Sequence, residues 1–207
     1  MTGEKEKVLF VGAGGPVAGK LLPELAERYD IVGIAGHRRD LASYCVELVS
    51  GELTSEHERI FADAFSRYSF SAIVWNAVRY HPMPLIESSR GTLHLEFDVS
   101  IALPLECLRT GITHGFIGTF VVVTSGLAFG VKPAWGSYSI TKRGQVIMAE
   151  YLARELANRG IKAKAVALGA IADVPATTLG GIFIRAIENE DPDTVVYTAY
   201  GPEWKRA

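Results

Sequence analysis

The chain has 207 residues, which suits one domain with a substantial buried core, so we treat residues 1–207 as a single domain. Apolar residues make up 48% of the chain and the net charge is only −2. This composition excludes a disordered chain, and the even mixture of charges gives no basic surface for nucleic acid or lipid.

The charged N-terminus lacks the apolar core of a secretory signal, and the longest uncharged stretch, residues 110–131, contains five glycines, which argues against a membrane span. The two cysteines, Cys45 and Cys107, lie far apart and form no metal-type pair. A disulfide between them is the alternative that we keep, but a reduced cytoplasmic protein without a metal site is the simpler interpretation.

In chain order, strands and helices are expected to alternate. Short apolar runs predict strands at residues 8–11, 31–35, 72–75, 120–124, 164–168 and 194–200, and residues 41–49 predict a short helix and the start of a further strand. Apolar positions at helical spacing predict helices from Pro16 to Ala26 and at residues 56–68, 87–110, 137–159 and 180–188, with Gly160 as a left-handed cap. This alternation predicts an α/β fold: one doubly wound Rossmann-type domain with a mostly parallel sheet of about seven strands.

The glycine-rich segment after the first strand is typical of a phosphate-binding turn. Glycines there let the backbone approach a pyrophosphate, and the following helix supplies free N–H groups and a positive dipole end. We therefore expect cofactor contacts from Gly12, Gly14, Gly15, Pro16 and Val17. The alternative is an ordinary tight turn, but its place between a strand and a helix favours a nucleotide.

The end of the second strand indicates which nucleotide is bound. A site for NAD usually has an acidic residue there, for the 2′-hydroxyl of the ribose. Here His37, Arg38 and Arg39 follow the strand, and cations at this point favour a 2′-phosphate and hence NADP(H) over NAD(H). The alternative is a solvated basic loop.

Tyr138 and Lys142 lie four residues apart at the start of a predicted helix and so share a face. A neighbouring ammonium lowers the pKa of a tyrosine and gives a proton donor or acceptor near neutral pH. Such spacing alone usually means surface contact. Ser125, however, ends a buried strand thirteen residues before Tyr138, and the glycine turn precedes both.

With these residues in place, the sequence resembles the short-chain dehydrogenase/reductase family from Val8 to about Tyr200. The most specific part is Val121-Val122-Val123-Thr124-Ser125 followed by Tyr138-x-x-x-Lys142. The resemblance implies that Tyr138 protonates a carbonyl oxygen as hydride arrives, or takes the alcohol proton in reverse. Lys142 then holds the nicotinamide ribose and lowers the pKa of Tyr138, and Ser125 hydrogen-bonds the substrate oxygen.

The resemblance also implies further cofactor contacts. They come from the turn after the fourth strand, from the acidic position after the third, which contacts the adenine, and from the stretch that borders the nicotinamide: Asn76, Ala77, Glu52, Leu53, Leu168, Gly169 and Ile171. It implies a small carbonyl or alcohol substrate and a homodimer or homotetramer built on the helices at residues 87–110 and 137–159.

The sequence departs from the family pattern at several positions. Ser100 stands where the family has an asparagine that anchors a relay water. We assign it a catalytic role as that residue's replacement, the alternative being a simple helix residue. Only residues 172–179 are available for the segment that usually covers the substrate, so the pocket is expected to be open or closed by a partner subunit. Residues that could line it are Tyr80, His81, Met83, Phe129 and Trp135.

Three functions follow from these features. The first is an NADP-dependent carbonyl reductase or alcohol dehydrogenase, which the intact Ser125, Tyr138 and Lys142 favour. The second is an NADP-binding sensor or interaction module with little turnover, motivated by the missing asparagine and lid. The third is an isomerase or dehydratase on the same scaffold, which would turn over without net change in the cofactor.

Overall fold

The computed structural model describes residues 4–36 and 40–199 and contains one seven-stranded sheet in which every strand pair is parallel. The strand order is β3-β2-β1-β4-β5-β6-β7. The strands are β1 (Lys7–Val11), β2 (Asp30–Ala35), β3 (Glu47–Ser50), β4 (Ala72–Trp75), β5 (Thr119–Ser125), β6 (Lys162–Leu168) and β7 (Val196–Ala199). The expected α/β fold class is confirmed.

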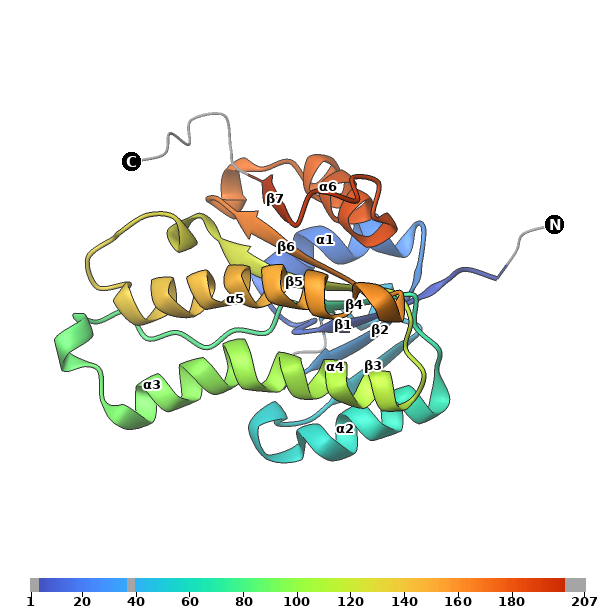
Figure 1. The fold of residues 1–207 in the computed structure, drawn as a ribbon, viewed down its shortest axis with the longest axis horizontal. Helices are drawn as coiled ribbons and strands as arrows, with labels where there is room; N and C mark the ends of the chain where they lie inside the picture. Colours follow the sequence, from blue (N-terminus) through green and yellow to red (C-terminus); the bar gives the residue numbers. More distant parts are fainter. Residues whose placement is uncertain (1–3, 37–39, 200–207) are drawn as a thin grey trace.

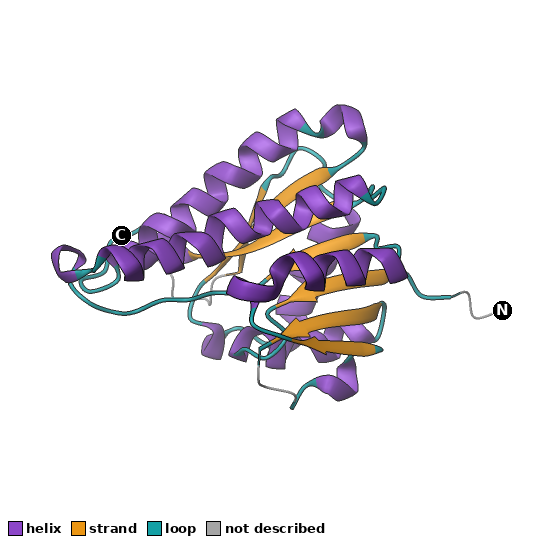
Figure 2. Ribbon diagram, turned by 90° about the horizontal axis from the view of Figure 1, so that it is seen from below, coloured by secondary structure: helices purple, strands orange, loops and turns teal. Residues whose placement is uncertain are grey.

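Helices cover both faces of the sheet (Figures 1 and 2). The α-helices are α1 (Pro16–Ala26), α2 (Leu53–Arg67), α3 (Arg90–Phe97), α4 (Leu103–Thr113), α5 (Gly136–Glu155) and α6 (Ala176–Glu188). Buried residues of α1 and α6 form one core with one face of the strands, and those of α2, α4 and α5 form the other. Because β4 is buried on both faces, its sequence is an unbroken apolar run.

The helix expected at residues 87–110 is interrupted in the structure. A separate 3₁₀ turn covers Leu85–Glu87, and α3 begins only after Ser89, whose hydroxyl oxygen accepts the Thr92 N–H at 3.1 Å. A π-helical turn, Asp98–Ala102, then joins α3 to α4, and α4 continues to Thr113. Proline explains the break, because Pro104 has no N–H to donate to the carbonyl four residues earlier.

Other helix boundaries differ by a turn from those expected. α2 begins at Leu53 rather than at residue 56, because the Glu56 carboxylate reaches back to accept the Glu52 N–H at 2.8 Å. α6 begins at Ala176, directly after Pro175. α5 ends at Glu155 and is followed by a 3₁₀ turn, Ala157–Arg159, which Gly160 closes with a φ of 72°, as its sequence predicts.

No α-helix among residues 4–36 and 40–199 combines the length and apolar character that a membrane span requires. Cys45 and Cys107 are both free thiols in the structure.

The turns after β1 and β4 are held together at the carboxyl edge of the sheet. Gly12 has a φ of 92°, and its carbonyl accepts the Asn76 side-chain amide at 2.8 Å. A Cβ atom on Gly12 would lie 2.5 Å from the backbone nitrogen of Ala77. The close approach of the two turns therefore requires glycine at this position.

We expect Gly12→Ala to destabilise the protein by about 1–3 kcal/mol, because alanine strains the left-handed backbone and forces the two turns apart. Urea unfolding measures this change. Gly19→Ala is the matched control: its Cβ would meet nothing within 4 Å, and helix propensity predicts equal or slightly higher stability. A Gly12→Ala midpoint equal to that of wild type would contradict the assigned constraint.

Candidate active site

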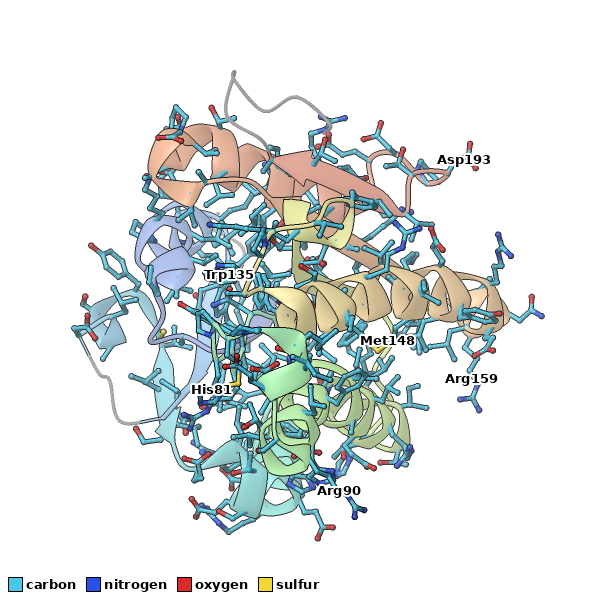
Figure 3. The ribbon with its side chains drawn as sticks, turned by 90° about the vertical axis from the view of Figure 1, so that its left-hand side faces the viewer. His81, Arg90, Trp135, Met148, Arg159 and Asp193 are labelled. Carbon is cyan, nitrogen blue, oxygen red and sulfur yellow. The ribbon has the colours of Figure 1, made fainter. Side chains whose placement is uncertain are left out.

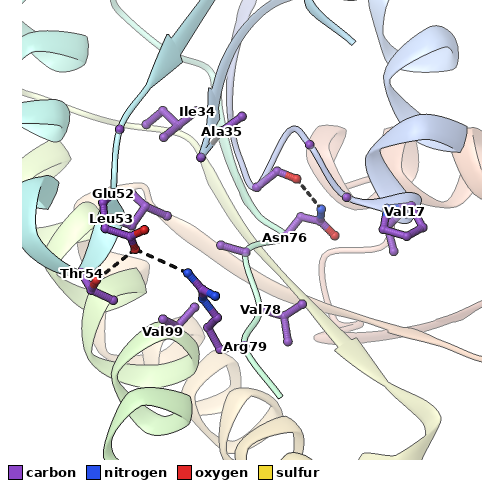
Figure 4. A pocket seen from close by; sticks show the side chains of 17 residues that line it. Val17, Ile34, Ala35, Glu52, Leu53, Thr54, Asn76, Val78, Arg79 and Val99 are labelled. Atoms are coloured by element: carbon purple, nitrogen blue, oxygen red, sulfur yellow. Dashed lines mark hydrogen bonds and ion pairs between the residues drawn. The ribbon is translucent and has the colours of Figure 1, made fainter. Parts of the chain in front are cut away.

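A pocket lies at the carboxyl edge of the sheet, beside the strands where the order reverses direction (Figure 4). It contains nine of the residues that the sequence assigned to a cofactor: Gly12, Gly14, Gly15, Pro16, Val17, Glu52, Leu53, Asn76 and Ala77. It also contains residues that the sequence did not predict: Ile34, Ala35, Gly36, Gly51, Thr54, Val78, Arg79 and Val99. Open parallel sheets bind ligands at such a reversal point.

The N-terminus of α1 meets the requirements of an anion site. Gly15 is its N-cap and supplies no side-chain cap, Pro16 occupies the first turn, and the first turn has no acidic residue. The free N–H groups and the positive helix end thus stay available to a phosphate. The residues present fit the pyrophosphate of a dinucleotide.

Glu52 and Arg79 face each other across the pocket (Figure 4). The Arg79 guanidinium lies 3.7 Å from the Glu52 carboxylate, which also accepts the Thr54 hydroxyl at 3.0 Å. Both charged side chains are roughly half exposed, so the pair is weak and can separate when a ligand enters. In the sequence, Arg79 could have been recognised as a pocket residue because it is a cation two positions after the Asn76-Ala77 turn.

The expected 2′-phosphate contacts, His37, Arg38 and Arg39, lie outside the described residues. The adjoining residues 34–36, which line the pocket, include no acidic side chain. The expectation of an NADP preference therefore stays a prediction.

Ser125, Tyr138 and Lys142 are brought together beside this pocket, although they do not line it. Ser125 ends β5, Tyr138 lies in the first turn of α5, and a hydrogen bond links their side chains. The Lys142 Nζ lies 5.5 Å from the centre of the Tyr138 ring. It also donates to the Val123 carbonyl at 2.8 Å.

The pKa values of the two groups shift in opposite directions because both are buried. Burial lowers the pKa of Lys142 to about 7. Burial is also the largest influence on Tyr138 and raises its pKa; the Ser125 hydrogen bond lowers it and Tyr80 raises it. We expected the Tyr138 pKa to be lowered by Lys142. In the structure the pKa of Tyr138 is instead raised, because desolvation of the ring is the largest influence.

An aromatic cluster covers Tyr138. Tyr80 stacks on Trp135 with ring centres 5.3 Å apart, and each ring meets Tyr138 edge-on at 5.5 Å.

Figure 3 shows Trp135 and His81 on the same side of the molecule. His81 has a different partner: its backbone N–H donates to the buried Glu96 carboxylate at 2.7 Å and its Nδ1 lies 3.4 Å from the same oxygen.

Ser100 lies in the π-helical turn and is completely buried. Its hydroxyl oxygen has no hydrogen-bond partner among the described residues, but its backbone carbonyl accepts the Gln145 side-chain amide at 3.1 Å. No pattern in the sequence pointed to Gln145, whose side-chain oxygen accepts a hydrogen bond from Lys142.

The remaining predicted cofactor residues follow β6. Leu168 pairs in register with Ser125, and the Gly169 N–H donates to the Ala199 carbonyl at 2.8 Å. Ile171 begins a 3₁₀ turn. Lys20 of α1 fixes the short segment that follows, because its ammonium donates to the carbonyls of Ile171, Ala172 and Val174 at 2.6, 3.1 and 3.0 Å.

Within the described part of the chain, no three His, Cys, Asp or Glu side chains gather as a metal site requires.

The lowered pKa of Lys142 predicts a pH-dependent stability. Between about pH 7 and 10 the unfolded chain holds a proton on Lys142 that the folded protein has lost, so folding gains stability as the pH rises. Relative to Lys142→Met, which cannot ionise, the wild type should gain about 1.4 kcal/mol per pH unit from pH 7 to 9. Urea unfolding of both proteins across this range checks the slope, and a pH-independent difference would contradict it.

Solved structures of low sequence identity share this fold. A glucose/ribitol-type short-chain dehydrogenase/reductase from Brucella melitensis has a TM-score of 0.82 at 16% identity, covering 98% of both chains. A short-chain dehydrogenase from Streptomyces avermitilis has a TM-score of 0.82 at 20% identity, covering 98% of this chain and 90% of its own. A putative NAD(P)-dependent gluconate 5-dehydrogenase from Beutenbergia cavernae, with NADP bound at low occupancy, has a TM-score of 0.81 at 17% identity, covering 96% of each.

No curated protein matches the chain by sequence. A family profile described as enoyl-(acyl carrier protein) reductase matches residues 31–194, which is more than half of the chain. The chain therefore belongs to the short-chain dehydrogenase/reductase family of oxidoreductases.

Proposed function

We propose that the protein is an NADP-dependent oxidoreductase that transfers hydride between nicotinamide and a small carbonyl or alcohol substrate. The observation that carries this proposal is the meeting of Ser125, Tyr138 and Lys142 beside a pocket that ends at an uncapped helix N-terminus. These three side chains would supply proton transfer, and the pocket fits a dinucleotide.

Distinct parts of the chain would hold the cofactor. The pyrophosphate would lie on the N–H groups at residues 14–17, and the adenine near Glu52 and Leu53. Arg38 and Arg39 would take the 2′-phosphate, a preference supported by the absence of an acidic side chain at residues 34–36. Lys142 would hold the nicotinamide ribose, and Leu168, Gly169 and Ile171 would border the nicotinamide.

The bound cofactor supplies or accepts the hydride. In the reductive direction, Ser125 would hydrogen-bond the carbonyl oxygen, where negative charge develops. The Tyr138 phenol, whose pKa burial raises, would donate its proton to that oxygen, and in reverse the phenolate would take the alcohol proton. A Lys142 ammonium close to the ring would favour the phenolate.

Tyr80 and Trp135 would exclude water from the reacting groups. They cover Tyr138 in a chain with only a short segment between β6 and α6, which Lys20 fixes to α1. A dry site strengthens the electrostatic interactions around a developing charge.

We expect the purified protein to bind NADPH more tightly than NADH, and Arg38→Ala/Arg39→Ala to weaken NADPH binding by about tenfold or more while changing NADH binding little. The physical reason is the loss of charge-assisted hydrogen bonds to the 2′-phosphate. Fluorescence titration measures all four affinities. Equal affinity for the two nucleotides in the wild type would contradict the NADP preference, and binding of neither would contradict the dinucleotide site.

We expect Tyr138→Phe to lower kcat by about 10²–10⁴-fold in a screen of carbonyl substrates that follows NADPH oxidation, because the general acid is lost. NADPH binding should remain within a few-fold of wild type, which separates chemistry from binding. Retained turnover in Tyr138→Phe would contradict the assigned acid. A wild type that binds NADPH but turns over no carbonyl would favour the sensor or interaction module.

We also propose that the protein is a homodimer or homotetramer, built on the helices at residues 90–113 and 136–155. This is supported by large apolar side chains that α3 and α5 leave exposed: Phe97, Ile140, Ile147 and Tyr151. Light scattering should give a mass above that of one chain, and a monomer at the assay concentration would contradict the proposal.

A further inference from the structure

Gln145 joins two parts of the site that the sequence treated separately. Its side chain is completely buried in α5, one turn after Lys142. The Oε1 atom accepts a hydrogen bond from the Lys142 Nζ at 3.0 Å, and the Nε2 atom donates to the Ser100 carbonyl at 3.1 Å. One amide thus links the ammonium to the π-helical turn between α3 and α4.

The local sequence makes the Ser100 carbonyl available for this bond. In a regular α-helix that carbonyl would accept the N–H of residue 104, but residue 104 is proline and has none. The π-helical turn, Asp98–Ala102, places this carbonyl where the Gln145 amide of α5 donates to it. Loss of the Pro104 N–H as a donor is costly for a buried carbonyl, and the Gln145 amide supplies a hydrogen bond to it.

The same contacts fix the direction of the Lys142 side chain. As an ammonium, the form favoured below its lowered pKa, its Nζ has three donor positions, of which Val123 and Gln145 occupy two at 2.8 and 3.0 Å. The amide cannot rotate to offer its NH₂ group to Lys142 without losing the Ser100 bond. Gln145 is therefore held with its oxygen toward the ammonium, and the third donor of Lys142 stays available to a ligand.

We infer that Gln145 is a positioning residue that orients Lys142 toward the nicotinamide ribose. This inference rests on the proposed function, because it assumes that Lys142 contacts that ribose. It also gives Ser100 a different role from the one predicted: the group that acts is its backbone carbonyl, through Gln145, while no residue that the structure describes bonds its hydroxyl.

Binding of two nucleotides tests the inference without a known substrate. NADPH carries the nicotinamide ribose, whereas adenosine 2′,5′-bisphosphate carries only the adenosine end. Gln145→Met keeps the side-chain length but removes both hydrogen bonds. We expect it to weaken NADPH binding by about tenfold and to change the affinity for the bisphosphate by less than twofold.

Two further variants make the comparison specific. Lys142→Met should cause the same selective loss, and the double variant should lose little more than Lys142→Met alone, because Gln145 acts through Lys142. Thr141→Val is the matched control. Its buried hydroxyl donates to the Tyr138 carbonyl at 2.9 Å and does not contact the Lys142 ammonium, so we expect both affinities to stay within twofold of wild type.

The outcomes separate the two proposals. Failure of wild-type protein to bind either nucleotide would overturn the proposed function. Binding of both by wild type, with Gln145→Met weakening both equally or neither, would overturn the positioning role and leave the cofactor site intact. If Gln145→Met does not fold by circular dichroism, Gln145→Asn replaces it. Its shorter amide cannot span both partners, and the same selective loss is expected.

Discussion

The approach of two backbone turns at the centre of the sheet is the constraint on which the site depends. β1 lies between β2 and β4; the chain continues from β1 into α1 on one face of the sheet, and from β4 toward α4 on the other face. The turns after β1 and β4 therefore face each other, joined by the Asn76 amide on the Gly12 carbonyl. A side chain on Gly12 would fill this junction and separate the strands whose ends form the pocket.

Lys142 shows how burial and function oppose each other beside that junction. An ammonium in an apolar interior is destabilising, and the fall of its pKa to about 7 expresses this. Hydrogen bonds to the Val123 carbonyl and the Gln145 amide offset part of this desolvation cost. Unlike a carboxylate, these two neutral groups do not neutralise the charge. A lysine with a strongly shifted pKa beside a pocket is the kind of group that is frequent at functional sites.

The interrupted helix has a related explanation. Pro104 has no N–H for the Ser100 carbonyl, and the π-helical turn places that carbonyl where Gln145 donates to it. The break is thus a local departure from regular structure that the tertiary contacts satisfy. The aromatic cluster is similar, because Tyr80 and Trp135 from separate loops meet on Tyr138 and contribute to the burial that raises its pKa.

The sequence by itself determined what depends on local pattern. The unbroken apolar strands predicted the parallel sheet, Gly160 predicted a left-handed helix end, and the Tyr138–Lys142 spacing predicted a shared face. The glycines after β1 likewise predicted that this turn lines the pocket. These features follow from backbone geometry over a few residues, which the order of residue types encodes directly.

Only the tertiary structure decided which side chains meet and how their environments change them. Arg79 and Val99 line the pocket and Gln145 contacts Lys142 because separate elements converge there, which no spacing in the sequence encodes. The raised pKa of Tyr138 was missed for the same reason: proximity to Lys142 is local, but desolvation depends on every element that covers the ring. The first turns of α2, α3 and α6 also escaped prediction, because side-chain caps and flanking prolines, rather than apolar periodicity, decide where a helix starts.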